Sequence, residues 1–272
     1  MSFDLSVVTA TCRRPDLVVE SVRSALAQVG PSIEVLVVDD DPQGSARAPI
    51  EALAKQDARV RYLVGAPSSG GAPARVYNQG LAQAQGRAVV FLDDDDVALP
   101  GAFKSLLEAI DEKPTRAFAF GLVEPFGGDP ELMIHETAFF MDATARARAA
   151  ARSGTRFLLA QLTYGASIFV VSGAIFRREA AQGAGGFDPA VRINTALDLA
   201  ARLVQEHTWA LVDEPVVRYR VHPGSLMHDL GNKADLEGSY KAMVRNVRAK
   251  LGLFGWLRFR QYAKRVVSSV AS

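Results

Sequence analysis

Two patterns of hydrophobic positions alternate along the first hundred residues. Short apolar runs bounded by polar residues are typical of strands that are buried on both faces, and they lie at Leu5–Thr11, Glu34–Asp39, Val60–Val64 and Ala88–Leu92. Segments with helical spacing separate them and begin near Pro15, Ala46 and Ala74. This alternation predicts an α/β fold with a parallel sheet between helices.

Two of the predicted strands end in consecutive carboxylates. Asp39, Asp40 and Asp41 end the second strand, and the fourth runs directly into Asp93, Asp94, Asp95 and Asp96. Parallel strands direct their carboxyl ends to one edge of a sheet, where ligands bind. Adjacent carboxylates repel one another, and Mg²⁺, Mn²⁺ or Ca²⁺ relieves that repulsion. An acidic turn in solvent is the alternative, but it does not explain the apolar strand that leads into it.

Two glycine-rich segments flank this predicted edge. Ser68 to Gly80 opens a helix that carries Arg75 and Asn78 in its first turn, which suits a phosphate; a solvent-exposed linker is an equal alternative. Gly183–Asp188 predicts a loop that permits close backbone approach, or an ordinary turn. Between them, Leu158 to Arg178 predicts a helix followed by the strand Ser167–Ser172, which would extend the sheet.

Composition places the chain among globular proteins. It has 272 residues, 49% of them hydrophobic and 22% charged, which suits one large α/β domain or two small ones. The single cysteine, Cys12, forms no intrachain disulfide, and the N-terminus enters a strand without a signal-like segment. No apolar run reaches the roughly 20 residues that cross a bilayer. We therefore expect a cytoplasmic protein that does not span a membrane.

Charge is unevenly distributed despite a formal net charge of +1. Residues 238–272 hold eight Lys or Arg and no Asp or Glu, so the remainder carries 23 basic against 30 acidic residues, a net −7. An acidic body argues against nucleic-acid binding. At 100° per residue, one arc of the predicted C-terminal helix is apolar: Trp256, Phe259, Tyr262, Ala263, Val266, Val267 and Val270, flanked by Arg258, Arg260, Lys264 and Arg265. This arc either lies on an anionic membrane or packs against the body.

Several segments resemble family 2 glycosyltransferases in order and spacing, over about residues 3–228. They are Val37 to Asp40, Asn78 to Gly80, Ala84 to Gly86, Phe91 to Asp96, Ile175 to Arg178, Gly185 to Asp188, Leu199 to Leu203 and Val217 to His222. The resemblance implies a GT-A fold with a Rossmann-like, mostly parallel sheet. It divides the chain into a donor-binding half (1–99), an acceptor-binding half (100–230) and a basic helical extension (231–272).

The implied activity is transfer of a sugar from a nucleotide-diphosphate sugar, most commonly a UDP-sugar, to a glycan or lipid-linked acceptor, with Mn²⁺ or Mg²⁺ and with inversion. The resemblance places the nucleotide sugar near Thr9, Ala10, Asp39, Asp40, Arg75, Asn78, Asp93 and Asp94. It makes Asp95 the direct metal ligand, with Asp93 beside it. His222 is either a further ligand or a structural histidine.

One position departs from the family pattern. Inverting members carry an acidic pair just before the helix that follows the Gly183–Asp188 loop, and alignment on Arg202-Leu203 puts Thr195 and Ala196 there. The expected general base is therefore missing. Asp198 lies about 200° further round the helix, and it either caps that helix together with Thr195 or acts as the base. Asp188 is the other candidate base.

Two alternatives to an active transferase remain. A sugar nucleotidyltransferase needs a glycine-rich basic loop after the first strand, and the segment from Thr9 to Arg14 contains no glycine. The second is a nucleotide-sugar-binding protein without turnover, which Ala196 favours directly. Such a protein and the enzyme would both bind donor, so a turnover assay separates them.

Overall fold

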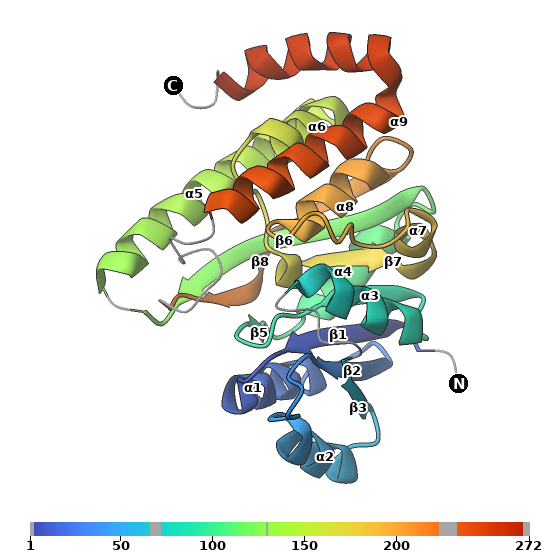
Figure 1. The fold of residues 1–272 in the computed structure, drawn as a ribbon, viewed down its shortest axis with the longest axis vertical. Helices are drawn as coiled ribbons and strands as arrows, with labels where there is room; N and C mark the ends of the chain where they lie inside the picture. Colours follow the sequence, from blue (N-terminus) through green and yellow to red (C-terminus); the bar gives the residue numbers. More distant parts are fainter. Residues whose placement is uncertain (1–2, 66–71, 129, 223–232, 269–272) are drawn as a thin grey trace.

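A computed structural model of the chain describes residues 3–65, 72–128, 130–222 and 233–268. One eight-stranded sheet runs through it in the order β3-β2-β1-β4-β7-β6-β8-β5 (Figure 1). The strands are β1 (Leu5–Thr11), β2 (Ile33–Asp39), β3 (Val60–Val64), β4 (Ala88–Phe91), β5 (Val97–Ala98), β6 (Arg116–Phe126), β7 (Ala174–Arg177) and β8 (Thr208–Arg220). The predicted α/β fold is confirmed.

The four N-terminal strands form the parallel part of the sheet. β1 pairs in parallel with β2 and β4, and β2 with β3. Every residue of β2 and β4 is buried, as their unbroken apolar runs predict. The C-terminal ends of β1, β2 and β4 therefore lie side by side. Beyond β4 the sheet becomes mixed, because β7 is antiparallel to both β4 and β6 while β6 and β8 are parallel.

Helices cover both faces of this sheet. The core on one face includes α1 (Pro15–Leu26), α2 (Arg47–Gln56) and α4 (Ala102–Asp111). The other includes α3 (Pro73–Gln83), α5 (Pro130–Ser153), α6 (Thr155–Tyr164), α7 (Arg178–Gly183), α8 (Thr195–Leu203) and α9 (Lys233–Ser268). Gly80 lets α3 lie directly on β1, because a Cβ at this position would collide with Val8. The division of the chain at residues 99 and 230 stays a prediction; strands from both halves belong to the same sheet.

The predicted strand Ser167–Ser172 is wrong. The strand of this region is β7, which starts at Ala174 after a 3-10 turn at Val171–Gly173 and enters the sheet between β4 and β6. The preceding segment is apolar because Ile168 and Phe169 are buried in the core, where Phe169 stacks on Phe120. Side-chain packing, rather than ladder pairing, accounts for its hydrophobic pattern.

The C-terminal helix packs against the body. Gly252 (φ 66°, ψ 174°) kinks α9 into segments 233–251 and 253–268; in Figure 1 the first runs beside α6 and α8, and the second turns across the top of the molecule. Trp256, Phe259 and Ala263 are buried, with Trp256 and Phe259 against Tyr164 of α6. The predicted apolar arc therefore covers α6, the packing alternative, and Val270 lies outside the described residues. None of the described helices has the length and apolarity needed to cross a membrane.

Candidate active site

A cavity of about 570 Å³ opens at the carboxyl ends of β1, β2 and β4. Ala10, Thr11 and Asp40 form its floor, together with Asp93, Asp94 and Asp95 that follow β4. Its walls come from elements that are distant in the chain: Tyr77 of α3, Glu136 and Phe139 of α5, the segment before β7, and residues 192–197 at the start of α8. The fold thus places the predicted acidic edge in an open cavity that both halves of the chain line.

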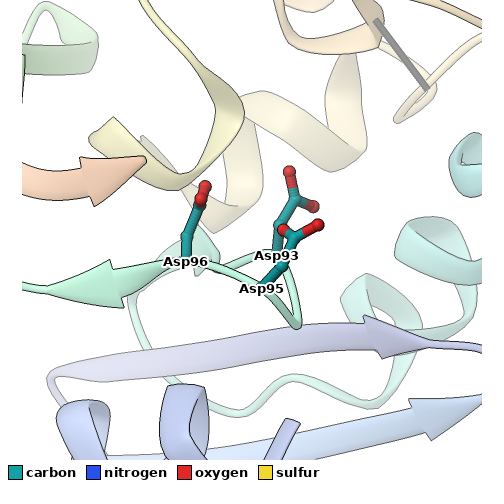
Figure 2. Close-up of side chains that lie close together, drawn as sticks. All are labelled: Asp93, Asp95 and Asp96. Carbon is teal, nitrogen blue, oxygen red and sulfur yellow. The ribbon is translucent and has the colours of Figure 1, made fainter. Parts of the chain in front are cut away.

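The acidic turn after β4 brings three carboxylates together. One oxygen from each of Asp93, Asp95 and Asp96 lies within 4.8 Å of the others (Figure 2). Tyr77 donates its hydroxyl to Asp93, and Ser21 donates to the Asp93 carbonyl at 2.9 Å. Hydrogen bonds from α1 and α3 thus hold Asp93 close to the other two acids despite their mutual repulsion. Hard oxygen donors at this separation fit a divalent cation.

Asp96 differs from the other two in its surroundings. It is 1% exposed and accepts hydrogen bonds from the Ser172 hydroxyl at 2.6 Å and the Arg220 backbone N–H at 3.0 Å. It therefore ties the turn to β8 and to the segment before β7. Asp93 and Asp95 line the cavity instead, and Nε2 of His222 lies 3.0 Å from Asp95 Oδ2. Of the three residues that the sequence proposes as metal ligands, Asp93 and Asp95 thus belong to the carboxylate group, and His222 contacts it through Asp95.

Burial and mutual repulsion disturb the titration of this turn. Burial, followed by the charge of Asp95, raises the pKa of Asp93 to about 7 and that of Asp94 to about 6. The same two causes raise the pKa of Asp96 well above its usual value. These shifts express the cost of holding several negative charges in one buried turn. A bound cation would offset that cost.

Arg14 is a site residue that the sequence analysis missed. It precedes α1, and one of its guanidinium nitrogens donates to Asp94 at 3.2 Å and to Asp95 at 2.7 Å. The Thr11 hydroxyl donates to the other oxygen of Asp94 at 2.7 Å. Asp94 is thus engaged by β1 and the loop after it. The available signal was the Arg13-Arg14 pair directly after the first strand.

The residues predicted to bind the nucleotide occupy two kinds of position. Ala10 and Asp40 line the cavity, whereas Thr9 is fully buried in β1. Asp39 accepts hydrogen bonds from the backbone of Asp41 and Ala46 and from the Tyr62 hydroxyl. It therefore shapes the turn from β2 into α2, and its contact with a nucleotide stays a prediction.

Asn78 positions the Gly183–Asp188 loop. Its side-chain amide donates to the Phe187 carbonyl and accepts from the Phe187 N–H, both at 2.8 Å. Gly186 has φ 68°, and a Cβ there would collide with the Asn78 side chain, so this approach needs glycine. Arg75 is exposed and is not among the cavity-lining residues. Ser68 to Gly71 of the predicted flexible loop lie outside the described residues.

The acids predicted as general bases are both outside the cavity lining. Asp198 is fully buried and accepts from Arg202 at 2.8 Å and from Asn246 at 2.9 Å. Asp188 accepts from Ala190 at 2.9 Å, Asn246 at 2.8 Å and Arg245 at 3.1 Å. Burial raises the pKa of Asp198 above its usual value. Burial also acts to raise the pKa of Asp188, but hydrogen bonds from Asn246 and Ala190 outweigh it and leave that pKa below its usual value.

The predicted capping box is wrong. α8 begins at Thr195 after Asn194, which has φ 60° and ψ 36°, and no side chain caps the helix. Asp198 instead accepts from Arg202 on one oxygen and from Asn246 on the other. Thr195 and Ala196 line the cavity, so the position where the family pattern has its acid does face the site.

Glu136 is the second site residue that the sequence analysis missed. Among the described cavity-lining residues from the second half of the chain, it is the one that carries a carboxylate. It lies on α5, a helix that the hydrophobic pattern did not single out, and it is partly buried beside Phe139. The second half of the chain therefore contributes an acid to the cavity that the first half lines with its strand-end carboxylates.

Comparison with known proteins agrees with this architecture. The chain is 33% identical over 123 residues to a GalNAc(5)-diNAcBac-PP-undecaprenol β-1,3-glucosyltransferase of Campylobacter jejuni, covering 45% of this chain and 40% of that protein. It is 34% identical over 116 residues to the putative teichuronic acid biosynthesis glycosyltransferase TuaG of Bacillus subtilis, covering 43% and 45%. The chain thus spans less than half the length of these relatives.

Solved structures share the fold at low sequence identity. S. aureus TarS 1–349 superposes with a TM-score of 0.65 and 17% identity, over 90% of this chain and 65% of that one. The same protein in complex with UDP-GlcNAc gives 0.65 at 18% identity, over 90% and 66%. The model of glycosyl transferase family 2 matches residues 6–184, well over half of the sequence. The chain therefore belongs to glycosyl transferase family 2.

Proposed function

We propose that the protein transfers a sugar from a nucleotide-diphosphate sugar to a glycan acceptor, with inversion at the transferred carbon. The observation that carries the proposal is the placement of Asp93 and Asp95 at the end of β4, facing a cavity that both halves of the chain line. A UDP-sugar is the donor we expect, as the TarS structures with UDP and UDP-GlcNAc suggest for this fold.

Asp93 and Asp95 would hold Mn²⁺ or Mg²⁺, with His222 beside Asp95 as a further ligand. When bound, the ion supplies positive charge against the diphosphate that leaves as the sugar–phosphate bond breaks. Arg14 would orient Asp94 and Asp95 through its hydrogen bonds to both, and it adds a positive charge at the same end of the cavity. Asp40 and Ala10 complete the floor on the nucleotide side.

The acceptor needs a group that takes its hydroxyl proton, because a single displacement without a base is slow. Ala196 cannot supply one, and Asp188 and Asp198 are held by Asn246 away from the cavity. Among the described residues from the second half of the chain, Glu136 is the carboxylate that lines the cavity, apart from the strand-end acids proposed to hold the metal and nucleotide. We assign it as the proton acceptor, and the two sequence-predicted acids remain the alternatives that the same experiment tests.

A lipid-linked glycan is the acceptor class that we propose. Two of the similar proteins, from C. jejuni and E. coli, are named as glucosyltransferases acting on undecaprenol-linked sugars. Such an acceptor is presented at a membrane, so a cytoplasmic protein would work at the inner membrane face. Two further similar proteins are named for succinoglycan and teichuronic acid biosynthesis, which supports a glycan as the acceptor.

The decisive experiment has two stages. Thermal unfolding is measured with UDP, GDP, ADP and CDP, each with and without Mn²⁺, since a ligand that binds the native state raises its stability. The stabilising nucleotide then identifies the sugar donors for a transfer assay on polyprenyl-diphosphate-linked sugars. Stabilisation by none of the four nucleotides, together with no transfer, would overturn the proposal.

A second candidate is a nucleotide-sugar-binding protein without turnover, favoured by Ala196 on the cavity wall. It predicts the same thermal stabilisation but neither transfer nor slow hydrolysis of the donor. Donor hydrolysis needs no known acceptor, because water replaces it. Release of UDP from a stabilising UDP-sugar at a rate above that of the heat-inactivated protein would eliminate this candidate.

A further inference from the structure

The outward side of segment 253–268 carries a group of apolar side chains that are largely exposed in the described part of the chain. Leu253 is 55% exposed, Phe254 80% and Leu257 47%. They lie on the opposite side of the helix from Trp256, Phe259 and Ala263, which are buried toward α6. Figure 1 shows this segment across the end of the molecule farthest from α2 and β3. We call Leu253, Phe254 and Leu257 the outer apolar group.

Cations surround the outer apolar group on the same side. Arg258, Arg260, Lys264 and Arg265 are all exposed. At 100° per residue their positions fall within the same outward arc as the three apolar side chains. Residues 253–268 contain no Asp or Glu. The segment therefore presents a face that is both apolar and uniformly positive.

Other exposed apolar side chains of the described residues have different surroundings. They are Val29, Val64, Ile134, Met141, Leu236 and Tyr240. Those on α5 share their helix with Glu131, Glu136 and Asp142, and those in segment 233–251 lie near Asp235 and Glu237. Val29 and Val64 are isolated on a loop and on β3. Only segment 253–268 combines clustered apolar groups with an absence of carboxylates, among the residues that the structure describes.

We propose that this face docks on a bilayer that contains anionic phospholipid. Leu253, Phe254 and Leu257 would enter the boundary between headgroups and acyl chains, and the four cations would lie among the phosphates. The sequence indicated a different side of this helix for membrane contact, the arc that contains Trp256 and Phe259. That arc is buried against α6, so the outer apolar group takes its place in the proposal. The inference deepens the proposed function by naming the surface that presents its lipid-linked acceptor, but the docking itself requires no turnover.

Charge also sets the orientation of docking. Residues 1–237 carry a net charge of −7, which an anionic surface repels, whereas residues 238–272 carry eight basic and no acidic side chains. Attraction near such a surface falls off within a Debye length of about 8 Å at physiological salt. The protein therefore binds with segment 253–268 facing the lipid and its acidic body directed away.

Vesicle flotation of the full chain tests the proposal. Vesicles of phosphatidylcholine alone are compared with vesicles containing 30% phosphatidylglycerol, at roughly physiological salt. The variants are Leu253→Ala/Phe254→Ala/Leu257→Ala and Arg258→Gln/Arg265→Gln. The matched controls remove exposed groups elsewhere: Val29→Ala/Met141→Ala and Arg23→Gln/Lys55→Gln. All of the substituted side chains are exposed, so each protein is expected to fold, and circular dichroism with thermal unfolding checks this.

We expect the parent and both controls to float with anionic vesicles and not with neutral ones. Each of the two face variants should lower the partition coefficient by about tenfold or more. No flotation of the parent, or equal flotation of parent and apolar variant, overturns the proposal. A change of oligomeric state in the apolar variant without any change in flotation also overturns it, in favour of a second copy as the occupant.

Thermal stabilisation by UDP and Mn²⁺, measured on the same proteins without vesicles, separates this inference from the proposed function. Unchanged stabilisation in the face variants with lost flotation supports docking as a property of α9 alone. If the parent floats but no nucleotide stabilises it, the surface is retained and the function is rejected. The reverse result retains the function and rejects the surface.

Discussion

Asp188 and Asp198 accept hydrogen bonds from the same nitrogen, Nδ2 of Asn246, at 2.8 and 2.9 Å. Asp188 belongs to the loop that Asn78 pins to α3, and Asp198 belongs to α8, while Asn246 comes from α9. One amide group therefore joins the C-terminal helix to both elements. The two acids nearest to the expected base position stabilise the docking of α9 in this arrangement.

Replacing Asn246 with Ala should lower the free energy of unfolding by about 1–3 kcal/mol, because the buried carboxylate of Asp198 then loses one of its two partners. Urea unfolding followed by circular dichroism measures the change. Arg248→Ala is the control, since Arg248 is exposed on the same helix and its loss should change stability by less than about 0.5 kcal/mol. Equal stability of the two variants would show that the bridge contributes nothing.

Replacing Glu136 with Gln should reduce the rate of donor hydrolysis or transfer by roughly 10²- to 10⁴-fold, the usual contribution of a positioned base. Donor binding, measured as thermal stabilisation by the nucleotide, should stay unchanged. Glu131→Gln is the control, because Glu131 is exposed on α5 and does not line the cavity.

The same assay on Asp188→Asn and Asp198→Asn tests the sequence-predicted bases. We expect rates within a few-fold of the parent at equal folded protein, because neither side chain lines the cavity. A large loss in one of them, with Glu136→Gln near the parental rate, would return the role to that acid and require α9 to release it from Asn246.

Replacing Asp95 with Asn should abolish Mn²⁺-dependent stabilisation by UDP. Asp95 is the carboxylate that repels its neighbours, and it also contacts His222 and Arg14. Thermal unfolding with Mn²⁺ and with chelator gives the measurement, and Asp213→Asn on the exposed part of β8 is the control. The unfolding temperature of each protein without Mn²⁺ is its own baseline, because the change removes a repelling charge and also the ion pair with Arg14. Unaltered metal-dependent stabilisation would remove Asp95 from the ligand set.

Replacing Trp256 with Ala should cost about 3–5 kcal/mol, the range for truncating a large buried aromatic side chain. Trp256 is 7% exposed and lies against Tyr164 and Phe259. Leu253→Ala, on the exposed side of the same segment, should change stability by about 0.5 kcal/mol or less. Comparable losses of stability in the Trp256→Ala and Leu253→Ala proteins would mean that the exposed side of segment 253–268 anchors it as much as the buried side does.

Local pattern predicted the N-terminal half of the fold well. Apolar runs identified β1 to β4 to within a residue or two, because strands buried on both faces need apolar side chains at successive positions. The acids after β2 and β4 were visible for the same reason, since each interrupts a run at the carboxyl edge of the sheet. The resemblance to family 2 assigned Asp93, Asp95 and His222 to one site; His222 does contact Asp95, 127 residues away in sequence, and their role as metal ligands stays a prediction.

Tertiary structure alone decided which of these groups face the cavity. Asp39, Asn78, Asp188 and Asp198 are polar residues in motif positions, but each is satisfied by hydrogen bonds from a distant or neighbouring segment and helps to shape the site. Arg14 and Glu136 became site residues through packing of α1 and α5. The sequence determined the strands and the charge at their ends because both depend on adjacent residues; the orientation of side chains depends on contacts across the fold, which no local pattern contains.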